Sequence, residues 1–111
     1  MADEPTPQAR MEVIVPENQS VGTYANGFGT WFNQTDFTID FFIHLPGDER
    51  VDQETGDHYL NAPVQVVARI KLPPTLIFRL MQQLEGAYTE YEKTFGTVTP
   101  LGDDPNLTPP S

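Results

Sequence analysis

Residues 36–44 read DFTIDFFIH and residues 64–72 read VQVVARIKL, and the rest of the fold is built around these two stretches. In both stretches apolar and polar residues alternate with a period of two, which is typical of a strand with one buried face. The apolar face of the first stretch consists of Phe37, Ile39, Phe41 and Ile43. That of the second consists of Val64, Val66, Ala68, Ile70 and Leu72. The alternation predicts two strands of one sheet.

An antiparallel pairing with Asp40 opposite Arg69 gives every residue a compatible neighbour. On the polar side this register also pairs Phe42 with Val67 and Thr38 with Lys71. On the apolar side it pairs Ile39 with Ile70, Phe41 with Ala68, and Ile43 with Val66. A slip of one residue would set apolar side chains opposite polar ones, whereas a slip of two preserves the pattern and stays open. We expect Asp40–Arg69 to be an exposed cross-strand ion pair rather than part of an active site.

Residues 22–46 predict a hairpin whose turn lies at Asn33-Gln34, because aromatic and β-branched residues fill both of its sides. Residues 11–15, MEVIV, predict an edge strand or an extended arm that Pro16 ends. Residues 46–63 combine Pro, Gly and many acids, and they predict a long exposed loop rather than an element.

After Pro73-Pro74, the stretch from Thr75 to about Thr94 predicts an amphipathic helix, with Gly96 where a C-cap belongs. Its apolar residues recur at three- and four-residue steps, and they are Leu76, Ile77, Leu80, Met81, Leu84, Ala87, Tyr88, Tyr91 and Phe95. The expected fold class is therefore α+β, an antiparallel sheet of three or four strands covered on one face by this single C-terminal helix.

The composition bounds the domain organisation and excludes several classes of function. The 111 residues carry a net charge of -10, with six basic against sixteen acidic residues and no cysteine. A basic surface for nucleic acid or for an anionic membrane is therefore not expected, and neither are disulfides or thiolate metal sites. We expect tails at residues 1–9 and 97–111, one domain at residues 10–96, and, since the first ten residues are no signal peptide, a cytoplasmic protein.

Candidate chemistry is sparse. The acids of the 46–63 loop, with His58, do not follow the spacing of a calcium loop, and cation binding there stays open. His44 and His58 lack a metal-binding H-x-x-x-H arrangement. Gly27 and Gly29 open a strand and not a helix, so no phosphate loop is predicted. We expect no catalytic residue, no metal and no cofactor.

A family resemblance rests on several short motifs taken together. These are Tyr24-Ala25-Asn26, Phe28, Thr35, the run Asp36 to Phe41, the run Val67 to Ile70, the two prolines, the Leu-spaced helix, Tyr91-Glu92 and Phe95-Gly96. In this combination, residues 22–96 resemble domain of unknown function 3467, a family of small bacterial proteins. The resemblance implies a fold and supplies no activity, cofactor or catalytic residue. Strands followed by a long C-terminal helix, in an acidic protein, are also similar in topology to the export chaperone SecB.

The outer sheet face motivates a hypothesis about function. One helix covers only one face of a sheet, while the other face carries Trp31, Phe42 and Val67, with Asp40 and Arg69 beside them. Contiguous apolar surface of this kind usually marks an interface, most often of a two-fold dimer. We therefore expect a non-catalytic interaction or structural module that forms homodimers or higher oligomers through these five residues. The alternatives are a SecB-like holdase for unfolded clients and a small-ligand binder that uses the space between helix and sheet.

Overall fold

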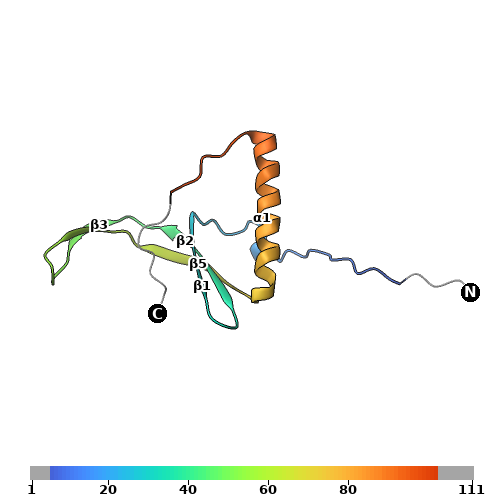
Figure 1. Cartoon of the computed structure of the whole chain (residues 1–111), viewed down its shortest axis with the longest axis horizontal. Coiled ribbons are helices and arrows are strands. Elements are labelled where there is room, and N and C mark those ends of the chain that lie inside the picture. The colour runs from blue at the N-terminus through green and yellow to red at the C-terminus, as the bar shows by residue number, and fades with distance from the viewer. Residues whose placement is uncertain (1–5, 103–111) are drawn as a thin grey trace, which may run out of the picture.

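The computed structural model describes residues 6–102 and shows an α+β chain with two antiparallel sheets and one long C-terminal helix (Figure 1). The elements in chain order are a 3-10 turn at Glu17–Gln19, β1 (Gly27–Phe32), β2 (Phe37–His44), β3 (Asp48–Val51), β4 (His58–Asn61), β5 (Val64–Leu72) and α1 (Pro74–Phe95). The larger sheet has the strand order β1-β2-β5, and β3 pairs only with β4. The predicted fold class is confirmed.

The turn between β1 and β2 lies where the sequence predicts it. The Asn33 side-chain oxygen accepts hydrogen bonds from the backbone N–H groups of Thr35 (2.9 Å) and Asp36 (2.8 Å). The Asn33 backbone N–H donates to the carbonyl of Asp36 at 3.0 Å. This is the local bonding that favours Asn in turns, and it closes the hairpin without glycine.

The predicted register of β2 against β5 is confirmed up to Phe41 and wrong beyond it. Asp40 pairs with Arg69 and Phe41 with Ala68, but Phe42 then pairs with Val66 and Ile43 with Gln65. The register shifts between Phe41 and Phe42, so that Val67 is the extra residue of a β-bulge. Such a shift exchanges the two faces, and Val66 and Val64 therefore lie on the face of Phe42 rather than on the expected apolar face.

The prediction of a featureless loop at residues 46–63 is wrong, because β3 and β4 form a hairpin there. Its turn is stabilised by the Asp52 side chain, whose Oδ1 accepts from the backbone N–H groups of Glu54 (2.8 Å) and Thr55 (3.3 Å). Gly56 adopts a φ of +76°, which suits glycine. Nearly all residues of both strands are exposed, so no apolar alternation could reveal them.

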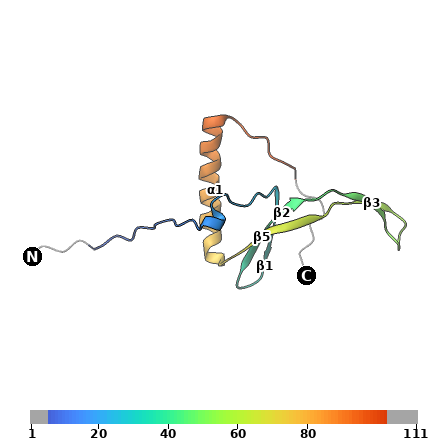
Figure 2. The ribbon, with the colours of Figure 1, turned by 180° about the vertical axis from the view of Figure 1, so that it is seen from behind.

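Residues 11–15 form no strand, and of the two predicted alternatives the extended arm is observed. The N-terminal segment runs past α1 and away from the sheet (Figures 1 and 2). At the other end, residues 97–102 run back from α1 toward the sheet (Figure 1). There the backbone N–H of Val98, a half-buried residue, donates to a carboxylate oxygen of Glu92 at 2.9 Å. The outermost parts of the two predicted tails lie outside the described residues.

The helix itself agrees with the sequence, but its predicted position over the sheet is not observed. Pro74 begins α1, and the backbone N–H of Gly96, at a φ of +99°, donates to the Glu92 carbonyl to end it. No residue of α1 is buried, and α1 stands beside the sheet and not over it (Figures 1 and 2). Among residues 6–102, the only large side chains that are fully buried are those of Phe42 and Asp40, and both belong to the sheet. A single chain therefore does not close around one core.

Candidate functional site

The two faces of the β1-β2-β5 sheet differ in kind. Cross-strand pairing puts Gly27, Gly29 and Trp31 on the side of Asp40 and Phe42, and we call this side the Asp40 face. Pairing puts Phe28 opposite Phe41, Thr30 opposite Ile39 and Phe32 opposite Phe37 on the other side, and we call it the Phe41 face. Ala68 and Ile70 of β5 pair with Phe41 and Ile39 and so belong to the Phe41 face.

A buried carboxylate lies at the centre of the Asp40 face. Asp40 is 1 % exposed, and its oxygens accept from three donors. Arg69 donates through Nε (2.6 Å) and Nη2 (2.9 Å), and the Trp31 indole Nε1 donates at 2.8 Å. The two bonds from Arg69 form the bidentate geometry in which guanidinium and carboxylate bind most strongly.

These contacts decide the ionisation of Asp40. The hydrogen bond from Arg69 lowers the pKa of the carboxyl below its ordinary value of 3.8, and the Trp31 bond and the charges of Arg69 and Lys71 act in the same direction. Burial alone would raise the pKa, and here it does not prevail. Asp40 also raises the pKa of Arg69. The carboxylate stays ionised and fully hydrogen-bonded, which suits a structural ion pair better than a proton-transfer group.

Phe42 is the second buried residue of this face, at 2 % exposure. Its ring lies against Gly27, where an added Cβ would clash with the ring carbons, and it contacts the His44 ring edge to face at 5.8 Å. The small residues therefore make room for the chain's own aromatic ring. Within one chain, Phe42 and Asp40 are therefore already covered, while their predicted part in an interface stays a prediction.

The other three predicted interface residues surround this buried pair. Trp31 is half-buried, Val67 is the half-buried residue of the bulge, and the Arg69 side chain remains 48 % exposed. The structure thus brings Trp31, Asp40 and Arg69 together into one hydrogen-bonded cluster. Sequence reasoning paired Asp40 with Arg69 but missed the indole bond. The available signal was Gly29, which lies opposite Asp40 and carries no side chain, two residues before Trp31 on the same strand.

The Asp40 face exposes only the aliphatic Val64 and Val66 of β5, whereas the Phe41 face and α1 expose large aromatic side chains. Phe28 is 60 % exposed and Phe32 78 %, and Ile70 is also exposed. On α1, the residues of the predicted apolar stripe (Leu76, Ile77, Leu80, Met81, Leu84, Ala87, Tyr88, Tyr91 and Phe95) are exposed except Ile77 and Leu80, which are half-buried. We call this set the helix stripe.

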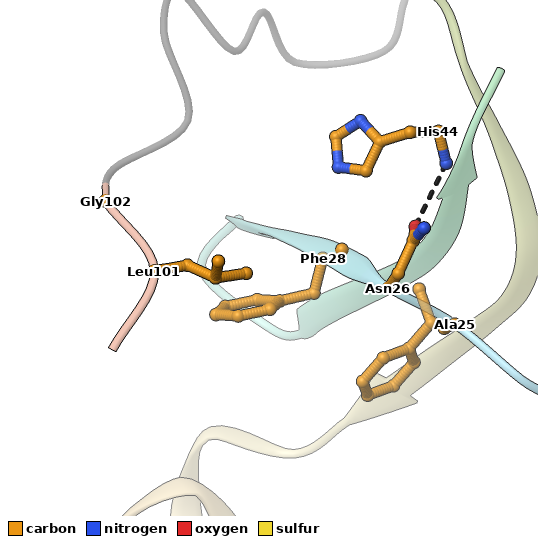
Figure 3. A pocket seen from close by; sticks show the side chains of 8 residues that line it. Ala25, Asn26, Phe28, His44, Leu101 and Gly102 are labelled. Atoms are coloured by element: carbon orange, nitrogen blue, oxygen red, sulfur yellow. Dashed lines mark hydrogen bonds between the residues drawn. The ribbon is translucent and has the colours of Figure 1, made fainter. Parts of the chain in front are cut away.

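A depression of about 850 Å³ lies at one end of the sheet (Figure 3). Phe28, Phe41 and His44 line it, and Leu101 of the C-terminal segment lies beside the Phe28 ring. The only hydrogen bond drawn there joins the backbone N–H of His44 to the Asn26 side-chain oxygen at 3.0 Å. The described part of its lining is mainly apolar, and its polar side chains are Asn26 and His44.

The acidic β3–β4 hairpin does not assemble a cation site. Asp48 accepts from Arg50 and Asn61, both at 3.3 Å, and Glu49 lies 3.2 Å from His58. These two acids thus face donors and not one another. No group of three or more His, Cys, Asp or Glu side chains within residues 6–102 is arranged to hold a metal ion. The same part of the chain contains no helix long and apolar enough to cross a membrane.

Comparison with known proteins identifies the family and nothing more specific. Residues 1–99 match the family model described as "Protein of unknown function (DUF3467)". The chain therefore belongs to this family, as the motifs between residues 22 and 96 indicated. Neither a curated protein nor a solved structure shows significant similarity to the chain.

Proposed function

We propose that this DUF3467 chain is a non-catalytic protein-interaction module that associates with itself through apolar surface. The observation that carries the proposal is the exposure of two apolar surfaces, the Phe41 face and the helix stripe, in one chain. Monomeric soluble proteins rarely leave contiguous apolar patches of more than a few hundred Å² in water. The proposal moves the interface from the Asp40 face, where the chain's own residues cover Phe42, to these two surfaces.

The state of Asp40 supports a role without catalysis. It is the most deeply buried acid among the described residues, and it accepts hydrogen bonds from Arg69 and Trp31. A carboxylate held by a bidentate guanidinium and an indole is poorly placed to exchange protons with a substrate. The third hypothesis, a ligand between helix and sheet, loses its support because α1 does not lie over the sheet.

Light scattering and sedimentation across a range of concentrations test self-association. We expect a saturable oligomer, and we expect Leu84→Glu to weaken it at least about 100-fold, since a buried charge without a partner costs several kcal/mol. The matched control is Gln82→Glu, which adds the same charge on the opposite side of α1. A monomer at all concentrations, or equal effects of the two variants, would contradict the proposal.

The second candidate is a SecB-like holdase, which the same exposed surfaces favour because unfolded clients bind to apolar patches. Its test is the aggregation of reduced lysozyme in the presence of the protein. The holdase would be favoured if stoichiometric amounts of the protein suppress this aggregation, if Leu84→Glu abolishes the suppression, and if Gln82→Glu retains it. A finite oligomer without suppression would favour self-association.

A further inference from the structure

The Phe41 face and the helix stripe are complementary in dimensions. The 22 residues of α1 span about 33 Å, and the nine residues of β5 span about 30 Å. Three strands at about 4.8 Å spacing present a face about 10 Å wide between the outer strand axes, which matches the diameter of one helix. One helix of this length is therefore sufficient to cover the face.

The two surfaces also match in chemistry. The helix stripe contains no side chain that is charged at neutral pH. Arg79, Glu90 and Lys93 lie on the other sides of α1, and Glu85 and Glu92 lie at the edge of the stripe. The Phe41 face, as its register defines it, contains only apolar residues, Thr30 and Gln65. Contact between them would desolvate no charge, so the net charge of -10 is no obstacle at the contact itself.

The link between β5 and α1 opposes closure within one chain. Leu72 ends β5 and Pro74 begins α1, so that Pro73 alone connects them, with an extended backbone at φ -67° and ψ 145°. Connections between a strand and a helix that packs on its sheet usually take two to six residues. Two successive prolines stiffen this shorter link and direct α1 away from its own sheet.

From these observations we propose that the occupant of the Phe41 face is the helix stripe of a second copy of this chain, in a reciprocal two-fold exchange. Contact between two sheets alone, or between two helices alone, leaves the other apolar surface in water. The exchange covers both surfaces of both copies in one closed dimer. This inference rests on the proposed function and names its partner and geometry.

The exposed area is sufficient for a stable dimer. Six aromatic side chains on the two surfaces are between 36 % and 78 % exposed, and they are Phe28, Phe32, Phe41, Tyr88, Tyr91 and Phe95. With roughly 150–250 Å² for each whole side chain, they expose on the order of 700 Å² per chain. A standard stable interface buries about 800 Å² per partner, and the aliphatic residues of both surfaces add to the aromatic area.

The absence of native cysteine in the sequence makes a direct test available. Ala68→Cys places a thiol on the Phe41 face, and Ala87→Cys places one in the helix stripe, each by a small change in volume. The two variants are made with tags of different size, so that a mixed dimer can be told from a dimer of like chains. They are mixed, equilibrated and treated with a short bis-maleimide. We expect a mixed cross-linked dimer to form more than about tenfold faster than in the matched mixture of Ala68→Cys with Gln82→Cys, because docking raises the effective concentration of the thiols.

The other outcomes overturn the inference in distinguishable ways. If two Ala87→Cys chains cross-link to each other as fast as Ala87→Cys cross-links to Ala68→Cys, the helices pack against each other. This result would contradict the reciprocal exchange but not the proposed self-association. Another outcome concerns one chain that carries both Ala68→Cys and Ala87→Cys. If sedimentation shows this chain to be monomeric and the two thiols are cross-linked within it, α1 closes on its own sheet. The proposed self-association would then fail as well. Equal rates for Ala87→Cys and Gln82→Cys would show that the helix stripe makes no specific contact.

Discussion

The Asp40 face and the Phe41 face belong to the same three strands, yet one chain completes only the first of them. On the Asp40 face, Gly27 leaves room for the Phe42 ring, and Trp31 and Arg69 bind Asp40, so both residues are buried by their neighbours. On the Phe41 face every position of β1 carries a side chain, Phe28 and Phe32 stand in solvent, and no element within residues 6–102 covers them. Burial thus depends on which residues lie opposite one another, and not on how apolar a face is.

The largest expected difference between the Asp40 face and the Phe41 face comes from truncating a phenylalanine on each. Phe42→Ala should lower the free energy of unfolding by about 3–5 kcal/mol, through lost burial and the cavity that remains. Phe32→Ala should cost less than about 1 kcal/mol when the protein is dilute enough to be monomeric, because this ring is 78 % exposed. Urea melts at low concentration measure both values. Equal losses would remove the distinction between the two faces.

Removal of the guanidinium tests the polar half of the Asp40 face. Arg69→Met leaves Asp40 buried with the Trp31 indole as its remaining donor. This change should lower the free energy of unfolding by about 1–3 kcal/mol at pH 7. The loss is smaller than that of a fully buried pair because the Arg69 side chain is half-exposed. Lys71→Met, whose amine contacts only the Thr38 hydroxyl at 3.2 Å, should cost much less. Urea melts of the two variants check the difference.

The cost of Arg69→Met should depend on pH in a defined direction. Because the folded pKa of Asp40 lies below 3.8, its contribution to stability is fully present above the unfolded pKa and is lost as the pH falls through the folded pKa. The stability gap between the wild type and Arg69→Met should therefore be constant from pH 7 to about pH 5 and should narrow below about pH 4. A gap that widens in acid would show that Asp40 is not the group responsible.

A smaller effect is expected from filling the space that Phe42 occupies. Gly27→Ala should cost about 1–2 kcal/mol, because the new methyl group collides with the Phe42 ring. Gly86→Ala in α1, where nothing lies within 4 Å, should instead stabilise the chain by about 0.5–1 kcal/mol through helix propensity. Thermal melts of both variants compare them. A neutral Gly27→Ala would mean that the ring moves aside freely, and Gly27→Ala with Phe42→Leu should recover part of the loss.

The smallest expected effect is that of substitutions in α1, and its dependence on protein concentration distinguishes the single chain from the oligomer. In dilute solution Leu84→Ala and Gln82→Ala should each cost less than about 1 kcal/mol, since Leu84 is 61 % exposed. At concentrations at which the protein self-associates, the Leu84→Ala loss should grow while the Gln82→Ala loss stays constant. Urea melts at two protein concentrations give both values. A large loss for Leu84→Ala in a monomer would show that α1 packs on its own sheet.

Local features were predictable where neighbours in sequence decide the structure. The hairpin turn follows from the side-chain chemistry of Asn33, and the end of α1 follows from Gly96. The β3–β4 hairpin was missed because its strands bury nearly nothing and so show no alternation. The cluster around Asp40 was half predictable, since the strand register implies the Arg69 pair, whereas Trp31 lies opposite Thr38 and its bond to Asp40 depends on the side-chain conformation.

The amino-acid pattern was sufficient to place β1, β2, β5 and α1 and to pair Asp40 with Arg69, because period-two alternation, proline and glycine act through the local backbone. The tertiary structure alone decided which face is buried, where the bulge at Val67 exchanges the faces, and where α1 lies. Alternation in the sequence predicts that the two faces of the sheet differ. It does not predict which face is buried. Cover depends on the residues across the strands, on the one-residue link at Pro73 and, in our proposal, on a second chain.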